Sequence, residues 1–376
     1  YSLTDGERNV IIGHEAGRFS STMDYSVLIG NAAGYNVSGA AEAVYIGRNA
    51  GYFVSGTKNT FIGSSAGRSN TGLNFASQEN VAIGRNAFYF NSTANYNVAI
   101  GADALQGAST GMSGDNNVAI GRQAALNATT AHSNVIIGRQ AGQDITTAQK
   151  AVVIGSNAGY SMAVQSASVL IGFESGRNQN AGSGGSVAIG HQALYSGTQN
   201  YQDVAIGINA GKKATGASAN NVFLGSAAGP SSTGVVQNKL YIHNAEGTPL
   251  IYGDFSAGTV DIDGVLSATA KSFNIAHPLY KDKRLVHGSL EGPEHGIYIR
   301  GTIEATEGCV IELPDYWQAL CDEYTVQLTP HGPYTVFIQE KQKDKVMVAS
   351  SSKDYKFDYF IVGKRTDEEL EVVQDA

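Results

Sequence analysis

The sequence is poor in the residues and motifs that mark several protein classes. Its 376 residues include two cysteines, one tryptophan and seven prolines. Cys309 and Cys321 have no His or Cys companions at metal-ligand spacing, which is typical of small buried apolar side chains. No apolar run approaches the ~20 residues of a membrane helix, so membrane insertion is not expected. Phosphate loops, nucleophile elbows and CxxC pairs are also absent, which disfavours the enzyme classes built on them.

Positive charge is not in excess in any part of the chain. The formal charge is −8, and residues 1–230 hold 12 Lys and Arg against 11 Asp and Glu. Residues 231–376 hold 13 and 22, so the acidity lies toward the C-terminus. Without a basic stripe to neutralise phosphates, nucleic-acid binding is not expected.

Glycine, by contrast, is abundant and periodic. The chain has 46 glycines without a G-X-Y period, which excludes collagen. The phrase NVAIGRNA at 80–87 recurs in variant form with its glycine 16 to 21 residues apart. This spacing predicts an array of thirteen units. The structural glycines of the array are Gly13, Gly30, Gly47, Gly63, Gly84, Gly101, Gly121, Gly138, Gly155, Gly172, Gly190, Gly207 and Gly225.

The positions around each glycine follow a strict pattern. Val lies three residues before it in twelve units and Ile directly before it in twelve, while Ala lies three residues after it in twelve. β-branched residues at i and i+2, ended by glycine, predict a short strand. Units of about 17 residues are too short for two helices and a turn. We therefore predict a parallel β-helix or β-roll, in which a thirteen-coil stack would be about 60 Å long.

The residue between Val and Ile is always apolar or aromatic. Because it points away from its two neighbours, both faces of the strand are apolar, and each needs cover. One face can line the coil, and we expect sister chains, most economically three about an axis, to cover the other. The predicted contacts in such a homotrimer are Ile11, Leu28, Tyr45, Phe61, Ile136, Val153, Leu170 and Phe223.

Two further positions recur along the array. Asn lies four residues before the glycine in seven units, which could form a ligand row or an ice-binding row, but an amide ladder of turn residues is favoured. Phrases such as Asn49-Ala50-Gly51 and Asn157-Ala158-Gly159 predict turns with positive φ. Tyrosines at one register could stack on sugars, although packing along an outer corner is favoured. These tyrosines are Tyr35, Tyr52, Tyr89, Tyr160 and Tyr195.

The period ends near residue 230, and two further segments follow. Residues 231–270 predict a neck of short strands at Leu240–His243, Leu250–Tyr252 and Thr259–Ile262. Residues 271–376 carry strand signals every 8–12 residues and one helical turn near Tyr316–Leu320, which indicates a compact β domain. The predicted fold is therefore all-β, with a shaft at 1–230, a neck and a C-terminal domain.

The C-terminal domain contains a specific resemblance. The phrase RLVHGSLEGPEHGIYIRG, from Arg284 to Gly301, follows KSFNIAHP and precedes LPDYW. It resembles a module near the C-terminus of tailed-bacteriophage fibre proteins, and the upstream NVAIGxxAG units are similar to the head repeats of trimeric adhesins. Many such fibres continue into a cleaved intramolecular chaperone, and residues 1–376 include no segment that we expect to be such a domain.

The resemblance implies a homotrimeric segment of a tail fibre, in a virion or a phage-like injection device. It implies partners among other fibre or baseplate proteins and a host polysaccharide or outer-membrane protein as receptor, met outside the cell. Two alternatives stay open: a polysaccharide-depolymerising tailspike and a bacterial trimeric surface adhesin. The absence of heptads and barrel strands weakens the second.

The fibre-like phrase also gathers polar residues that could carry chemistry. His277, His287 and His295 lie near Glu291 and Glu294, but their spacing matches no closed zinc pattern. The two glutamates invite comparison with the paired carboxylates of glycosidases. In a Gly/Pro turn, however, they more plausibly cap backbone amides or bind an arginine such as Arg300. We therefore expect no catalysis, metal or cofactor.

Overall fold

The computed structural model describes residues 6–37, 39–69, 76–90, 92–109, 111–164, 166–180, 184–198, 201–266, 272–288 and 296–366. The chain forms two compact units, Tyr1–Val265 and Leu266–Ala376. In the described residues all regular structure is β except for the single turn of helix α1 (Trp317–Leu320). The predicted all-β fold with a β-solenoid of about 17-residue repeats is confirmed.

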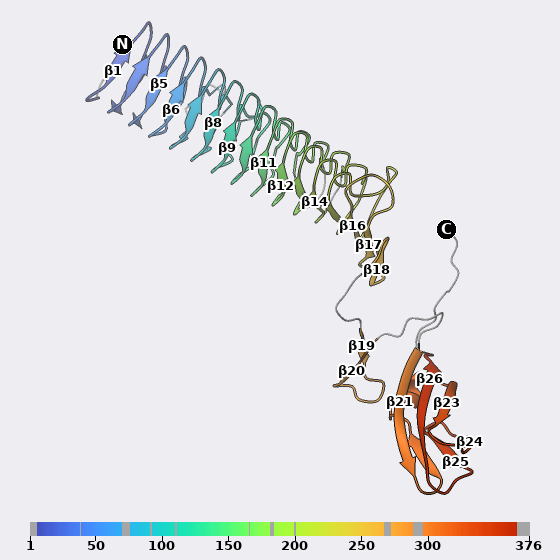
Figure 1. The fold of residues 1–376 in the computed structure, drawn as a ribbon. Coiled ribbons are helices and arrows are strands. Elements are labelled where there is room, and N and C mark those ends of the chain that lie inside the picture. The colour runs from blue at the N-terminus through green and yellow to red at the C-terminus, as the bar shows by residue number, and fades with distance from the viewer. Residues whose placement is uncertain are drawn as a thin grey trace. The chain divides into compact units, whose positions relative to one another are not determined.

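The first unit is a solenoid in which each repeat forms one coil (Figure 1). Thirteen three-residue strands stack in parallel, with Val opposite Val and Ile opposite Ile from coil to coil except at Thr60 and Leu224. The stacked strands are β1 (Val10–Ile12), β3 (Val27–Ile29), β5 (Val44–Ile46), β6 (Thr60–Ile62), β7 (Val81–Ile83), β8 (Val98–Ile100), β9 (Val118–Ile120), β10 (Val135–Ile137), β11 (Val152–Ile154), β12 (Val169–Ile171), β13 (Val187–Ile189), β14 (Val204–Ile206) and β15 (Val222–Leu224). A second, shorter contact joins β2 (Met23–Asp24) to β4 (Ala40–Ala41).

The glycine that ends each strand is required by the close stacking of the coils. The thirteen repeat glycines have φ between +111° and +139°, a region that side chains disfavour. A Cβ on Gly121 would also lie only 2.5 Å from the carbonyl oxygen of Gly138 in the next coil. Two residues later the chain turns in the left-handed region, as at Asn49 with φ of 57° and Asn157 with φ of 56°.

The two faces of the strands are oriented opposite to the prediction. The residues between Val and Ile point into the coil of their own chain, so they are core residues rather than contacts between chains. Alternation gives two apolar faces but does not tell which one is enclosed, and the prediction chose the wrong one. Leu28, Tyr45, Phe61, Ile136, Val153, Leu170 and Phe223 are buried, and Ile11 in the first coil is half-buried against the same core.

The space inside each coil is shared by the middle residue and the fourth residue after the glycine. Where the middle residue is bulky, the fourth is glycine, and a Cβ on Gly176 would lie 2.8 Å from a methyl carbon of Leu170. In three of the five coils whose middle residue is alanine the fourth is bulky, as at Leu105 beside Ala99, and Leu105 is buried. Ala82 with Phe88 and Ala188 with Leu194 follow the same rule. The other two coils have a small residue at both positions, Ala119 with Ala125 and Ala205 with Gly211.

A ladder of asparagine side chains runs through five consecutive coils of the interior. Each amide after the first donates to the side-chain oxygen of the preceding rung, as from Asn80 to Asn59 at 3.1 Å and from Asn134 to Asn117 at 2.9 Å. The rungs are buried, so the amide ladder is confirmed and an exposed ligand or ice-binding row is excluded at these positions. The rungs are Asn59, Asn80, Asn97, Asn117 and Asn134.

An aspartate takes the same position in a later coil. Asp203 is fully buried, and its Oδ1 accepts from the backbone and side-chain nitrogens of Asn221 at 2.8 and 2.9 Å. Its other oxygen has no hydrogen-bond partner within the described structure. Burial raises the pKa of Asp203 to about 6, although the bonds from Asn221 oppose the shift.

The segment predicted as a neck extends the solenoid sheet. Strand β16 (Lys239–Ile242) pairs in parallel with β15, and β17 (Ile251–Asp254) and β18 (Thr259–Ile262) continue the sheet in antiparallel order. The compact unit therefore ends after these strands, at Val265.

The second unit contains a hairpin and two small antiparallel sheets. The hairpin joins β19 (Ser272–Ala276) to β20 (Arg284–Gly288). One sheet has the order β21-β26-β23 and the other β22-β25-β24. The bounds are β21 (Gly296–Ala305), β22 (Cys309–Glu312), β23 (Tyr324–Pro330), β24 (Val336–Lys341), β25 (Lys345–Ser350) and β26 (Tyr355–Lys364).

One core joins the two sheets of the second unit. Phe357 and Ile361 from the first sheet and Val346 and Val348 from the second belong to the same buried cluster. Trp317 from α1 packs into this core with 1% of its surface exposed. The outer face of each sheet is left open to solvent.

Candidate functional site

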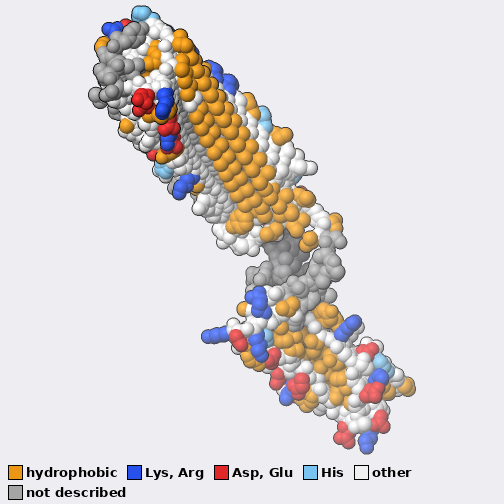
Figure 2. Space-filling view, turned by 90° about the vertical axis from the view of Figure 1, so that its left-hand side faces the viewer, with side chains coloured by type: hydrophobic (Ala, Val, Ile, Leu, Met, Phe, Trp, Pro, Cys, Tyr) orange, Lys and Arg blue, Asp and Glu red, His pale blue; other side chains and the backbone are white. Residues whose placement is uncertain are grey.

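The most extensive exposed feature of the first unit is a stripe of Val and Ile side chains, here called the apolar stripe. It consists of the two outward-facing residues of each of the thirteen stacked strands, all half-buried or exposed on the single chain. Exposure reaches 47% at Val10 and 57% at Ile12 in the end coil, and is 42% at Ile206. Figure 2 shows the stripe as a continuous hydrophobic band along one side of the solenoid.

The size of the stripe distinguishes it from ordinary surface apolarity. Thirteen coils about 4.8 Å apart, each two side chains wide, give a band about 60 Å by 10 Å, or roughly 600 Å². Monomeric proteins rarely expose larger contiguous patches. Specific interfaces bury about 800 Å² on each partner, so the stripe approaches what one such contact requires. Thr60 is its only polar member.

The tyrosines at the fifth position after the glycine form stacks along the solenoid corner. The rings of Tyr35 and Tyr52 are 4.8 Å apart and nearly parallel. The guanidinium of Arg68 lies between Tyr52 and Tyr89, at 5.1 and 5.5 Å from their ring centres. Because neighbours cover the ring faces, the arrangement favours packing along the corner over an open platform for sugars.

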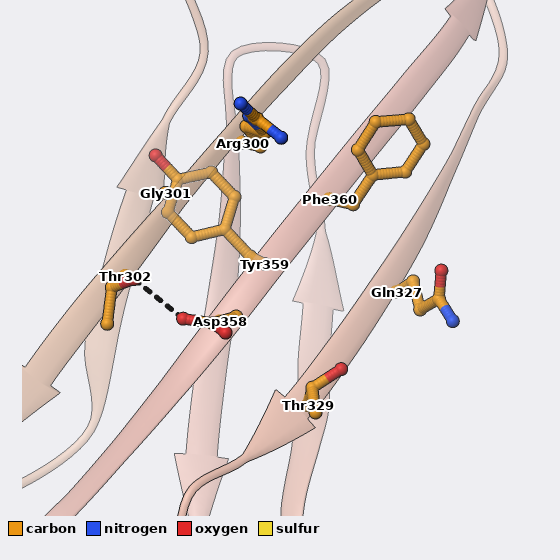
Figure 3. Close-up of a pocket in the computed structure, with 8 residues that line it drawn as sticks. All are labelled: Arg300, Gly301, Thr302, Gln327, Thr329, Asp358, Tyr359 and Phe360. Atoms are coloured by element: carbon orange, nitrogen blue, oxygen red, sulfur yellow. Dashed lines mark hydrogen bonds between the residues drawn. The ribbon is translucent and has the colours of Figure 1, made fainter.

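A second exposed surface lies on the outer face of the β21-β26-β23 sheet, here called the polar face. The register places Arg300, Phe360 and Gln327 in one row across the three strands. Thr302, Asp358 and Thr329 form the next row. These six side chains line a shallow groove of about 520 Å³, within the range of ligand sites (Figure 3).

The charged groups of the polar face differ in how they are held. Asp358 accepts from the Thr302 hydroxyl at 2.6 Å and lies 3.0 Å from Nε2 of His331. These two contacts, that of Thr302 first, lower the pKa of Asp358, so the group is an ionised acceptor at neutral pH. Arg300 is exposed and has no hydrogen bond or ion pair within the described residues. Its five N–H donors are therefore open to a ligand.

The outer face of the other sheet in this domain is apolar. On the outside of the β22-β25-β24 sheet, Val310 pairs with Met347 and Phe337 pairs with Ala349. Val310 is 44% and Phe337 47% exposed, so this face is apolar where the polar face carries charge.

The residues considered for chemistry do not form a site in the described structure. Nδ1 of His277 accepts from the backbone nitrogens of Leu279 and Tyr280, which makes it a turn residue. The structure does not describe Glu291, Glu294 or His295, nor the side chain of His287. Among the residues described, no three His, Cys, Asp or Glu side chains converge as metal ligands. Cys309 is half-buried and Cys321 is buried, and neither forms a disulfide bond within the described structure.

The sequence reasoning predicted an apolar strand face open to other chains but assigned it to the wrong residues, and it missed the polar face. A sequence signal existed for the apolar stripe, since the glycine beside each bulky middle residue marks the enclosed face. No local signal existed for the polar face, because the rows form only when distant strands pair. No helix in the described part of the chain is long and apolar enough to cross a membrane. Comparison of the chain with protein-family models, with curated proteins and with solved structures finds no match.

Proposed function

We propose that the chain is a structural and adhesive segment of a fibre, in which three copies associate along the apolar stripe. The observation that carries the proposal is the stripe itself, continuous over thirteen coils and left open by the single chain. Burying apolar surface contributes about 25 cal/mol per Å², so a band of this length favours association strongly.

The composition of the stripe supports a ring of chains. Its two edges are chemically distinct, a column of Val and a column of Ile. When the Val column of one chain packs on the Ile column of the next, the contact is heterologous, and such contacts form a ring when the rotation between neighbouring chains closes. Two chains related by a two-fold axis would also cover both columns, so the choice of three rests on the resemblance to trimeric fibres and adhesins.

The fibre role follows from this arrangement together with the resemblance of the sequence to tailed-phage fibres. The solenoid supplies a long repeated structure, and the separate β domain supplies a second, non-repeating surface for contact. Attachment to a host cell surface is the function that we infer from this combination. The chain would act in the virion or a phage-like device and without catalysis.

The mass of the chain in solution tests the association. Sedimentation equilibrium of the purified chain should give three times the monomer mass of 39.4 kDa. Val135→Asp and Ile137→Asp together place two charges in the middle of the stripe and should produce a smaller species.

A matched variant controls for the added charge. Thr147 is exposed and lies outside the stripe, so Thr147→Asp should leave the mass unchanged. Circular dichroism of both variants shows whether the solenoid is folded. A folded monomer of the unsubstituted chain would overturn the proposal, because the stripe would then be stable in water.

A further inference from the structure

We propose that the polar face of the second unit binds an acidic saccharide, a sugar that carries a carboxylate. This inference deepens the proposed function, since it gives the adhesive segment a ligand class and a location for contact. It is based on the arrangement of Arg300, Phe360 and Asp358, which is independent of the solenoid.

Aromatic side chains supply the floor of this surface. Phe360 is half-buried on the central strand, and its ring centre lies 5.5 Å from that of Tyr298, which is 42% exposed. A pyranose ring has an apolar face of C–H groups, whose partial positive charge suits the negative face of an aromatic ring. Two neighbouring rings offer a platform for more than one sugar unit.

Polar groups surround this floor on the same face. Gln327 offers an amide, Thr302 and Thr329 offer hydroxyls, and Asp358 offers carboxylate oxygens. Amide and carboxylate groups bind hydroxyl pairs, and the few polar groups of a ligand site fix the orientation of what it holds. Figure 3 shows these side chains projecting from three neighbouring strands around Phe360.

The charges decide which saccharide fits. Arg300 is directly opposite Phe360 on the neighbouring strand and has no partner among the described residues. Its planar fork matches a carboxylate in a bidentate fashion. Asp358, one row away, already accepts from Thr302 and contacts His331, so it repels a second carboxylate but still accepts from hydroxyls. The ligand's carboxylate is thereby directed to Arg300 and its hydroxyls to Asp358.

Calorimetric titration of the full chain with two matched probes tests the inference. The probes are trigalacturonic acid and neutral galactotriose, which differ in their carboxylates. The acidic probe should bind more tightly. Phe360→Ala should weaken binding of the acidic probe by about tenfold, which corresponds to about 1.4 kcal/mol. Arg300→Gln should abolish the preference for the acidic probe while retaining weak binding of both.

The control removes the same charge elsewhere. Lys353 is exposed in the turn between β25 and β26, and Lys353→Gln should leave both titrations unchanged. Fluorescence of the single tryptophan, Trp317, shows that each variant keeps the folded domain. Failure of the folded chain to bind either probe at millimolar concentration would overturn the inference. So would tight binding that persists in both variants.

Sedimentation of the same samples separates the two proposals. A trimer that binds no saccharide would overturn only this inference, and the proposed trimeric assembly would remain supported. A monomer that binds the acidic probe through Arg300 would overturn the proposed trimeric assembly and support the saccharide site on the polar face.

Discussion

The two units of this chain use β-structure in opposite ways. In the solenoid the strands are three residues long, parallel and repeated, and the interior is built from single buried residues flanked by Ala and Gly. In the second unit two strands reach ten residues, pairing is antiparallel and large side chains such as Trp317 and Phe357 fill one core. The solenoid depends on each coil fitting its two neighbours, whereas the second unit depends on contacts between residues far apart in sequence.

This difference determines how a local substitution affects the stability of each unit. A solenoid behaves as a chain of nearest-neighbour interfaces, so a defect in one coil weakens the stack on both sides. A small two-sheet domain behaves as one cooperative unit. The only tryptophan lies in the second unit, so its fluorescence reports on that unit alone and far-UV circular dichroism reports on both.

The largest expected effect is on the glycine column. Gly121→Val introduces a Cβ 2.5 Å from the carbonyl oxygen of Gly138, at a φ of +132°. We expect a loss of about 4 kcal/mol or more in the free energy of unfolding of the solenoid, because strain and a clash with backbone combine. Thermal denaturation followed by circular dichroism measures it, while Trp317 fluorescence should be unchanged.

The matched control lies in the second unit. Gly308→Ala meets no atom closer than the Val348 carbonyl oxygen at 3.7 Å, so little change is expected in either signal. Equal destabilisation by both substitutions would show that the glycine column has no special role.

The next effect concerns the shared interior volume of a coil. Leu170→Ala should cost about 2–5 kcal/mol by leaving a cavity. Gly176→Leu alone should cost about 1–3 kcal/mol by overpacking. The double variant should recover most of the stability, because Leu105 and Leu194 already occupy the equivalent position with φ of 47° and 51°. Urea denaturation of the four proteins gives the coupling free energy, and strictly additive losses would contradict the assignment of both residues to one space.

A smaller effect is expected from Asp203. Its pKa is raised by burial from the ordinary value of 3.8 to about 6, so the folded solenoid binds the proton more tightly than the unfolded chain. The resulting stability is present below pH 3.8 and is lost as the pH rises through 6. The total change is about 3 kcal/mol.

The test is a comparison of stability against pH for two proteins. Asp203→Asn restores the residue of the amide ladder and removes the titrating group. Above pH 6 this variant should be more stable than the parent, and the two stability curves should converge at acid pH. Parallel curves would mean that Asp203 does not titrate in this range.

The smallest effect is expected at an exposed pair of the second unit. Glu304 and Lys356 form an ion pair on the polar face of the sheet, and both remain accessible to water. Exposed pairs contribute little to stability, so Glu304→Gln should leave the melting midpoint of Trp317 fluorescence unchanged within replicate scatter. A clear decrease would indicate that this face is covered by further structure.

Much of the solenoid could be predicted because its information is local and repeated. Eleven copies of the Val-x-Ile-Gly pattern and two close variants, at Thr60 and Leu224, predicted the strand, the turn and the period. The enclosed face was chosen wrongly because alternation is symmetric. The sequence did contain a signal for the enclosed face. Gly176 accompanies the bulky Leu170, whereas the bulky Leu105 accompanies the small Ala99, which indicates that the middle residue and the fourth residue after the glycine share one interior space.

The second unit could be predicted only in outline. Its strand spacing indicated a β domain, and the predicted turn near Tyr316–Leu320 is found as α1. The polar face depends on β21 pairing with β26 in one register, such as Arg300 opposite Phe360, across some sixty residues. A shift by one residue would place these side chains in the core, and no neighbouring pattern fixes that choice.

The uniformity of the apolar stripe has a consequence for assembly. Every level presents the same two side chains, apart from Thr60 and Leu224, so copies displaced by one coil would match almost as well as copies aligned end to end. In the proposed assembly such sliding would be prevented by parts that do not repeat, among them the antiparallel strands β17 and β18. A uniform stripe would hold the copies together without fixing their alignment along the solenoid, and the non-repeating segments would have to fix that alignment.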